Sequence, residues 1–309
     1  MTARRGQRLT IALALFLSAA TVLLGSWKAL SRDQLAAPVR APLESSALSI
    51  GPAGPACGPR LFKAAVIDVS RSFDRVDEAV RAVVRTAQTC AADFRPLELH
   101  IILVGATTDA AAQLGPFGSD CEAPPALPPK PPPGCTPGEL AQRPEDTYRE
   151  CVERLQAYAS LVKTFNQTSQ RRRTIHAGRA LTLAAEIERV VTNRLAPGGL
   201  PVGFRARTLL LEGLVNASSL LQRRQRELAP LAGDQWLMSV YSDFEPDPPA
   251  TDLIAQLRHL ELSQMDVALF VLAHEAIEAP ERLERLRGAF PAARSLTVLG
   301  FGVSKRTLR

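Results

Sequence analysis

Lysine is scarce in this sequence. Only five of the 37 basic residues are lysine, which leaves 32 arginines, and the formal net charge is +6. Together with the many alanines and prolines, this bias indicates a GC-rich, bacterial genome rather than a nucleic-acid surface. No basic patch interleaved with aromatic residues and no nucleic-acid-binding motif is present, so we expect no nucleic-acid partner. The sequence also has no internal repeat, which excludes a solenoid architecture.

Signatures of nucleophilic catalysis are also missing. The sequence has no Ser-His-Asp or Cys-His arrangement, and its four histidines stand in unrelated contexts: His100, His176, His259 and His274. The cysteines lack the paired Cys-x-x-Cys spacing of a zinc site. We therefore expect neither a reaction of these classes nor a small-molecule substrate.

The amino-terminal residues have the pattern of a membrane anchor. Three arginines in 1–8 precede the stretch 9–27, which carries no charge over 19 residues and is close to the length that spans a bilayer. This pattern predicts a cytoplasmic basic tail at 1–8 and a transmembrane signal anchor at 9–27 in the inner (cytoplasmic) membrane. The rest of the chain is then expected on the periplasmic or extracellular side. A cleaved signal peptide is the alternative, although no clean Ala-x-Ala site follows the apolar stretch.

The next segment, 28–58, is rich in alanine, proline, serine and glycine and shows no sustained period. This composition predicts a flexible linker.

Five cysteines follow the predicted anchor: Cys57, Cys90, Cys121, Cys135 and Cys151. A few disulfide bonds are expected in an exported chain. Cys121 and Cys135 flank most of the prolines of a proline-rich segment at 115–138, and a bond between them would close it. Because five is odd, at least one thiol is free or pairs with another chain.

Residues 59–309 are expected to form one α/β domain. Hydrophobic residues make up 46% of the chain, which is enough for a sizeable core. Apolar runs typical of buried strands alternate with amphipathic segments typical of helices. Strands are expected at 64–67, 97–104, 235–242, 265–273 and 295–303, and helices at 75–91, 146–165, 175–195, 205–228, 251–263 and 278–289. The alternation predicts a doubly wound, mostly parallel, Rossmann-like sheet with helices on both faces.

Polar side chains follow the first predicted strand. Asp68, Ser70 and Ser72 come directly after the apolar run 64–67. In open α/β sheets, ligands bind at the carboxyl ends of the strands, so these side chains are expected at the site-forming edge. A carboxylate and two hydroxyls suit a hard cation such as Mg²⁺, or Mn²⁺ or Ca²⁺. The alternative is that Ser70 or Ser72 caps the helix that follows.

The stretch Asp68-Val-Ser-Arg-Ser72 resembles the Asp-x-Ser-x-Ser motif of von Willebrand factor type A domains. In that family the motif is the first part of a metal-ion-dependent adhesion site. The resemblance covers roughly 61–303 and implies the doubly wound fold described above. Two segments, at about 110–170 and 198–232, are then expected to be insertions.

The same resemblance assigns the other two parts of the site. Thr174, with Ala-Gly-Arg-Ala-Leu at 177–181, matches the family's threonine at the start of a helix, although three arginines replace the usual Gly-Gly before it. Asp243 matches the aspartate after a later strand, with Phe244 in the place of the usual glycine.

The resemblance implies a protein-binding module without a reaction. The metal ligands would be Asp68, Ser70, Ser72, Thr174 and Asp243, and one coordination position would stay open for an acidic residue of a partner protein. A divalent cation is a large local charge that a partner carboxylate can complete.

Two alternatives stay open. A metal-dependent phosphoester hydrolase would use Asp68 as its nucleophile. Haloacid dehalogenase-like hydrolases carry Asp-x-Asp, however, and Ser70 lacks the second carboxylate. The other alternative is a structural scaffold that has the same fold and holds no metal.

Overall fold

The computed structural model describes residues 48–106, 112–135, 145–228, 231, 233–244, 253–272 and 280–301. The predicted anchor at 9–27 and most of the predicted linker lie outside these ranges. Within them, no helix is long and apolar enough to cross a membrane. The chain divides into two compact units: Met1–Ser49 with Pro131–Ala159, and Ile50–Lys130 with Ser160–Arg309.

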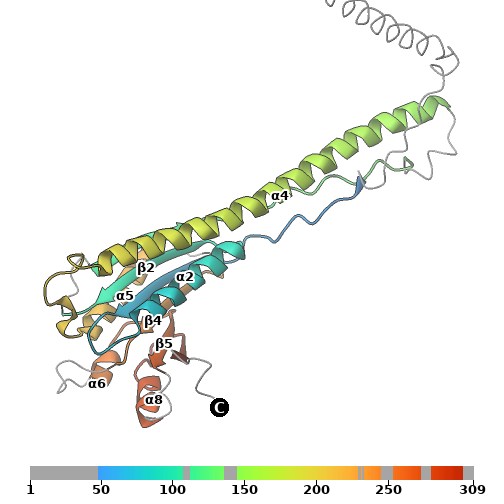
Figure 1. Cartoon of the computed structure of the whole chain (residues 1–309). Coiled ribbons are helices and arrows are strands. Elements are labelled where there is room, and N and C mark those ends of the chain that lie inside the picture. Colours follow the sequence, from blue (N-terminus) through green and yellow to red (C-terminus); the bar gives the residue numbers. More distant parts are fainter. Residues whose placement is uncertain are drawn as a thin grey trace, which may run out of the picture. The chain divides into compact units, whose positions relative to one another are not determined.

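The larger unit is built on a six-stranded sheet (Figure 1). Its strands are β1 (Leu61–Asp68), β2 (Leu97–Val104), β3 (Gln113–Ser119), β4 (Gln235–Tyr241), β5 (Asp266–Leu272) and β6 (Ser295–Phe301). They lie in the order β3-β2-β1-β4-β5-β6, and all neighbours are parallel except the pair β2 and β3. The predicted α/β fold with a mostly parallel sheet is therefore confirmed.

β1 lies inside the sheet, between β2 and β4. All eight of its residues are buried, as expected for a parallel strand that is covered on both faces. Its side chains alternate between two cores. Phe62, Ala64 and Val66 belong to the core on one face, and Ala65 and Ile67 belong to the core on the other.

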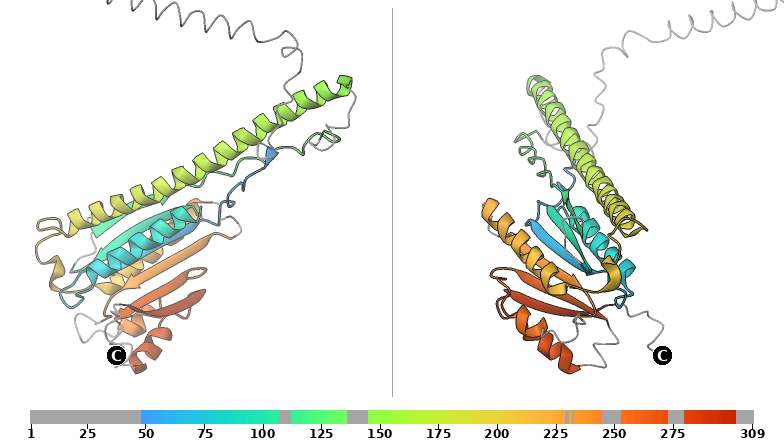
Figure 2. Two further views of the ribbon diagram at one scale, coloured as in Figure 1. Left: turned by 45° about the vertical axis from the view of Figure 1, so that its right-hand side comes forward. Right: turned by 90° about the vertical axis from the view of Figure 1, so that its left-hand side faces the viewer.

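Helices cover both faces of the sheet (Figure 2). The helix α2 (Val76–Ala92) and the part of α4 (Glu145–Leu195) from Leu183 onwards pack on one face. The other face is covered by three helices: α5 (Leu210–Glu227), α6 (Leu253–Leu257) and α8 (Pro280–Arg287). Their apolar side chains bury the sheet between two hydrophobic layers, which is the main source of its stability.

β3 is a strand that the sequence did not predict. It overlaps the proline-rich segment 115–138, which was expected to be a surface insertion, and it contains Pro116. Proline lacks a backbone donor and is tolerated at the edge of a sheet but not at its centre. β3 lies at the edge, antiparallel to β2.

The predicted break within 146–195 is wrong. The expected helices 146–165 and 175–195 are one continuous helix, α4, of 51 residues. The three arginines at 171–173 do not interrupt it, because arginine is a good helix former. Arg172 is buried, and its guanidinium lies 4.3 Å from the centre of the Phe94 ring.

Two disulfide bonds are present, Cys57–Cys121 in the larger unit and Cys135–Cys151 in the smaller. The predicted pairing of Cys121 with Cys135 is therefore wrong, whereas the prediction of a free thiol is confirmed by the buried Cys90. Disulfides persist in oxidising compartments, so these two bonds indicate an extracytoplasmic location.

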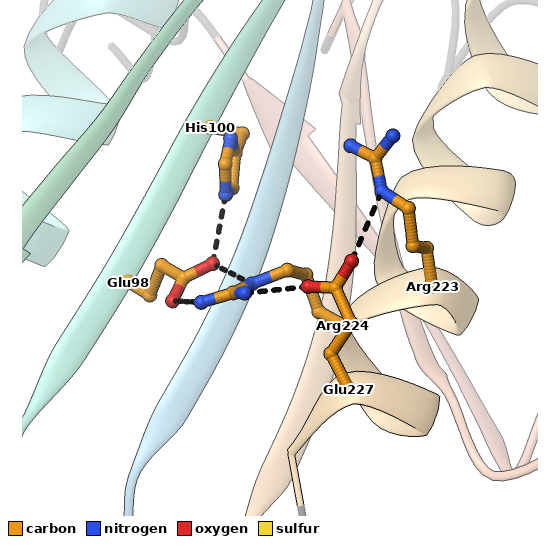
Figure 3. A network of polar contacts seen from close by, with 5 residues as sticks. All are labelled: Glu98, His100, Arg223, Arg224 and Glu227. Carbon is orange, nitrogen blue, oxygen red and sulfur yellow. Dashed lines mark hydrogen bonds and ion pairs between the residues drawn. The ribbon is translucent and has the colours of Figure 1, made fainter.

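A charged network ties α5 to β2 (Figure 3). Arg224 of α5 donates two hydrogen bonds to the carboxylate of Glu98 on β2, at 2.7 and 2.6 Å. His100 lies 2.9 Å from the same carboxylate, and Glu227 accepts a further hydrogen bond from Arg224. Burial raises the pKa of Glu98, but the hydrogen bonds from Arg224 and His100 outweigh it and leave the pKa below its ordinary value.

Glu98→Gln should destabilise the larger unit by about 1–2 kcal/mol at neutral pH, because it removes one charge of a bidentate, partly buried pair. The folded-state pKa of Glu98 is lowered, so its contribution is complete above the ordinary glutamate range and is lost as the pH falls through the folded-state value. Urea unfolding at neutral and at acidic pH measures both effects.

The matched control is Glu150→Gln, which removes an exposed pair with Arg154 on α4. Exposed pairs contribute little, so this change should cost less than about 0.5 kcal/mol. Equal effects of the two substitutions would contradict the role of Arg224 in fixing α5 to the sheet.

Candidate functional site

The candidate site lies where the winding of the sheet reverses. From β1 the chain goes to β2 on one side, and it later returns to β4 on the other side of β1. The carboxyl ends of two such strands form the crevice that binds ligands in doubly wound sheets. Asp68 ends β1, and Ser242 and Asp243 follow β4. Asp68 and Asp243, which the sequence placed after strands, therefore lie at this crevice, and Ser242 lies there although the sequence did not select it.

Asp68 is the centre of a hydrogen-bonded cluster. Its side chain is fully buried. The backbone N–H of Ser70 donates to Oδ1 at 2.9 Å, and the Thr208 hydroxyl donates to the same oxygen at 3.2 Å. The Ser242 hydroxyl donates to Oδ2 at 2.8 Å. Three separate loops therefore converge on one carboxylate.

The two serines after Asp68 are neighbours. The hydroxyls of Ser70 and Ser72 lie 3.0 Å apart. Ser70 is buried and Ser72 is exposed, so the pair leads from the buried carboxylate to the surface. Neither serine caps α2, because the N-cap residue is Arg75 and it makes no side-chain capping bond. The helix-cap alternative is therefore wrong, and helix capping does not explain why two hydroxyls lie beside Asp68.

Thr174 is not part of this cluster. It lies in the interior of α4, where its side chain is exposed and its hydroxyl donates to the backbone carbonyl of Gln170 at 3.2 Å. The expectation that Thr174 begins a helix is therefore wrong. The threonine that contacts Asp68 is Thr208, which stands two residues before α5.

Thr208 was missed because 198–232 was expected to be an insertion outside the fold. A signal for it was present in the sequence. Thr208 directly precedes the leucine-rich stretch that forms α5, and α5 in turn precedes β4. A threonine two residues before the helix that leads to β4 is the feature that identifies it.

The segment before α5 is held against the loop that follows β2. The N–H of Ala106 donates to the carbonyl of Phe204 at 2.6 Å, and the N–H of Leu209 donates to the carbonyl of Gly105 at 2.9 Å. A Cβ atom on Gly105 would lie 2.2 Å from the Phe204 carbonyl, so only glycine permits this approach. These contacts fix Thr208 beside Asp68.

Glycine also allows α5 to approach β2 closely. A Cβ atom on Gly213 would lie 2.3 Å from a methyl group of Val104. The start of α5 therefore packs tightly against the carboxyl end of β2. This contact fixes the end of α5 that lies next to Thr208.

The turn after β4 has a glycine-like conformation without a glycine. Phe244 has a φ of 54°, in the left-handed region that glycine favours. Its N–H donates to the Ser242 hydroxyl at 2.9 Å, and its side chain is buried in the core beside α5. Burial of the aromatic ring offsets a backbone strain of about 1–2 kcal/mol. The replacement of the family's glycine by Phe244 therefore does not remove the turn that places Asp243.

Two buried carboxylates lie close enough to interact. Burial raises the pKa of Asp68, and the nearby charge of Asp243 raises it further, while hydrogen bonds from Ser70 and Ser242 oppose the rise. In the part of the chain that the structure describes, no lysine or arginine forms an ion pair with Asp68. The cluster therefore holds negative charge in a buried place.

This donor set suits a hard divalent cation. Asp68 and Asp243 supply carboxylate oxygens, and Ser70, Ser72 and Thr208 supply hydroxyls, which are the oxygen ligands that Mg²⁺ and Ca²⁺ accept. A cation would also offset the repulsion between the two carboxylates. Across the described ranges, no three His, Cys, Asp or Glu side chains gather as a metal-binding group. A cation at this place would therefore depend on hydroxyl ligands as well as carboxylates.

The fold and the cluster together define an α/β domain with an acidic, hydroxyl-rich site at its switch point. Neither family models nor curated proteins give a match to the chain. Among solved structures, it is similar to the pilus adhesin SpaC from Lactobacillus rhamnosus GG in its open conformation, at 10% identity and a TM-score of 0.38. The match covers 80% of this chain and 28% of the adhesin. At so low a TM-score, the assignment of a site depends on the geometry of this chain's own residues.

Asp68→Asn should remove the pH dependence that the buried Asp68 carboxylate gives to the stability of the metal-free protein. The folded-state pKa of Asp68 is raised, so the ionised carboxylate opposes folding above that pKa, and the cost disappears as the pH falls through it. Unfolding in excess chelator from pH 4 to pH 8 should show a fall in wild-type stability with rising pH that the variant lacks.

The control for this measurement is Asp74→Asn, which changes a carboxylate that is 76% exposed in the same loop. It should leave the pH dependence unchanged. Identical pH profiles for the wild type and Asp68→Asn would show that the burial of Asp68 has no energetic consequence.

Proposed function

We propose that the larger unit is a von Willebrand factor type A-like module that binds a partner protein through a divalent cation. The cation would be Mg²⁺, or Mn²⁺ or Ca²⁺. Its ligands would be Ser70, Ser72 and Thr208, with Asp68 and Asp243 acting directly or through water. The observation that carries the proposal is the convergence of three loops on the buried carboxylate of Asp68, through the backbone N–H of Ser70 and the hydroxyls of Thr208 and Ser242.

The exposure of the cluster supports binding from one side. Asp68, Ser70, Thr208 and Asp243 are buried, whereas Ser72 is exposed. A cation held by these residues would therefore have its remaining coordination positions toward solvent. Mg²⁺ keeps several water ligands in such sites, and a carboxylate of a partner can replace one of them.

The charge around the cluster also favours an acidic partner. Arg71, Arg205 and Arg207 are exposed on the two loops that flank Asp68. These loops are neighbours, since the N–H of Arg71 donates to the carbonyl of Arg205 at 3.1 Å. Exposed positive charges increase the rate at which an oppositely charged partner meets the site.

We further infer that this module is displayed outside the cytoplasm by a membrane anchor. The uncharged stretch 9–27 and the arginines before it support a single-pass anchor in the cytoplasmic membrane. The two disulfide bonds support the export of the chain.

A metal-free scaffold is the second candidate. One observation favours it: both oxygens of Asp68 already accept hydrogen bonds from groups of this chain. The same observation weakens the phosphoester-hydrolase alternative, because a buried carboxylate with both oxygens engaged is poorly placed to attack a substrate. Metal binding distinguishes the module from the scaffold.

Mg²⁺ should raise the melting temperature of the wild-type protein. A ligand at 100 times its dissociation constant stabilises the native state by about 2.7 kcal/mol, which corresponds to several degrees for a chain of this size. Asp68→Ala and Thr208→Ala should abolish the shift, since each removes a proposed ligand. A thermal-shift titration with Mg²⁺, Mn²⁺ and Ca²⁺ measures this.

Thr174→Ala is the matched control. It makes the same change at an exposed threonine of α4 and should leave the Mg²⁺ response at the wild-type value. The metal-site proposal fails if none of the three cations shifts the melting temperature of the wild type, and the scaffold then becomes the better account.

A further inference from the structure

The segment that leads into β1 is fastened along α4 in the larger unit. We call residues 51–58 the strap, which is part of the blue segment in Figure 1. Three hydrogen bonds attach it to α4: the N–H of Gly51 donates to Oδ1 of Asn166 at 2.8 Å, and Arg173 and Arg172 donate to the carbonyls of Pro52 and Pro55 at 2.7 and 2.8 Å. The disulfide bond Cys57–Cys121 closes the end of the strap that is nearest to β1. The strap is therefore held by one covalent bond and by polar contacts that can open and re-form.

Arg172 lies directly beside this disulfide bond. Its Nη2 is 3.6 Å from Sγ of Cys121 and 4.0 Å from Sγ of Cys57. The rest of the guanidinium is fixed, because Nε donates to the carbonyl of Glu122 at 2.7 Å and Nη1 donates to the carbonyl of Pro55. The positive charge cannot leave the sulfurs without breaking these contacts.

The charge of this guanidinium is not paired with a carboxylate. Arg172 is 3% exposed, and none of the ion pairs in the described ranges includes it. Glu122, which follows Cys121, is exposed, so water screens its charge. The charge of Arg172 does act on a second neighbour, since burial and then Arg172 lower the pKa of His176. A cation in this position stabilises a thiolate that forms next to it.

The two disulfide bonds of the chain have opposite environments. Cys57 is exposed and Cys121 is partly exposed, so a thiolate in solution can reach the first sulfur. Cys135 and Cys151 are 4% and 2% exposed and lie in a hydrophobic cluster with Leu155. In the described part of the chain, no arginine or lysine contacts the sulfurs of that second bond. Exchange needs access to one sulfur and a stable leaving thiolate, and of the two bonds only Cys57–Cys121 offers both.

We propose that Cys57–Cys121 is a thiol–disulfide exchange site whose reaction partner is a dithiol reductant. A thiolate of the reductant attacks Sγ of Cys57, the bond between the two cysteine sulfurs breaks, and its electron pair stays on Sγ of Cys121 beside Arg172. The second thiol of the reductant loses its proton to water and attacks the mixed disulfide, which releases Cys57 as a thiolate that takes up a proton. The reductant is oxidised to a disulfide and the two cysteines are reduced. This site is separate from the cation cluster at Asp68 and does not depend on the proposed function.

The strap makes the exchange reversible and gives it a structural consequence. After reduction, Arg172 still donates to the carbonyls of Pro55 and Glu122, which stand two residues before Cys57 and one residue after Cys121. These hydrogen bonds keep the two thiols close together, so exchange with another disulfide can restore the bond. Until then the strap is held by hydrogen bonds alone and can open, whereas the oxidised strap stays tied to Cys121.

Selective reduction tests the proposal. The folded full-length chain is incubated with dithiothreitol at pH 7 without denaturant, free thiols are blocked with N-ethylmaleimide at successive times, and mass spectrometry measures the loss of each disulfide bond. Cys57–Cys121 should be reduced about tenfold faster than Cys135–Cys151. Hydrogen exchange in the strap should then rise, while exchange in β1 stays unchanged. This comparison uses the wild-type chain alone and does not depend on the folding of any variant.

The thiolate pKa separates the effect of the Arg172 charge from the effect of access. In the reduced protein, the pH dependence of alkylation at Cys121 should have its midpoint below about 8.5, the ordinary value for cysteine. Arg172→Gln should raise this midpoint by about one pH unit, because it removes the nearby positive charge. Arg173→Gln is the matched control. It loosens the same strap by removing the hydrogen bond to Pro52, and it should leave the midpoint at the wild-type value.

Three results would overturn the proposal. The first is reduction of the two disulfide bonds at equal rates in the folded protein. The second is a Cys121 midpoint that is the same in the wild type and in Arg172→Gln. The third is reduction of Cys57–Cys121 only at the rate of global unfolding, since the bond would then be inaccessible in the native state. Added Mg²⁺ or chelator should change none of these measurements, so failure of the metal proposal would not affect them.

Discussion

The buried carboxylate of Asp68 is the constraint around which the larger unit is arranged. A carboxylate without exposure is costly unless polar groups surround it. Here the groups come from three loops: the backbone N–H of Ser70, the Thr208 hydroxyl and the Ser242 hydroxyl. The loops cannot move independently, because each contributes to the solvation of the same two oxygens. This shared requirement links the end of β1 to the end of β4 and to the start of α5.

Backbone features elsewhere serve the same arrangement. Gly105 and Gly213 permit close approaches that a side chain would prevent: Gly105 to Phe204, in the segment before α5, and Gly213 of α5 to Val104 at the carboxyl end of β2. Phe244 adopts a left-handed conformation that lets its N–H reach Ser242, and the core compensates the strain by burying its ring. Close packing and local backbone strain thus hold a few polar side chains in position, as is common at binding sites.

The parts of this arrangement that could be predicted are those with a local signal. A continuous apolar run before Asp68 predicted a buried parallel strand, and the strand end located Asp68, Ser70 and Ser72. Thr208 could not be found in the same way, because it meets Asp68 across 140 positions of sequence. Thr174 was chosen instead because, with Ala-Gly-Arg-Ala-Leu at 177–181 after it, it resembles the family's threonine at the start of a helix, yet α4 runs through this position without a break.

Whether a cation or hydrogen bonds alone satisfy the cluster depends on Asp243 as much as on Asp68. Hydrogen bonds are enough for a single buried carboxylate, since the backbone N–H of Ser70 and the hydroxyls of Thr208 and Ser242 already reach both oxygens of Asp68. They do not remove the repulsion from a second carboxylate, which raises the pKa of Asp68 beyond the effect of burial. A bound cation, or a proton on one of the two carboxylates, offsets that repulsion. Two acidic residues placed together therefore fit the proposed cation site better than a metal-free scaffold, which has no use for the repulsion between them.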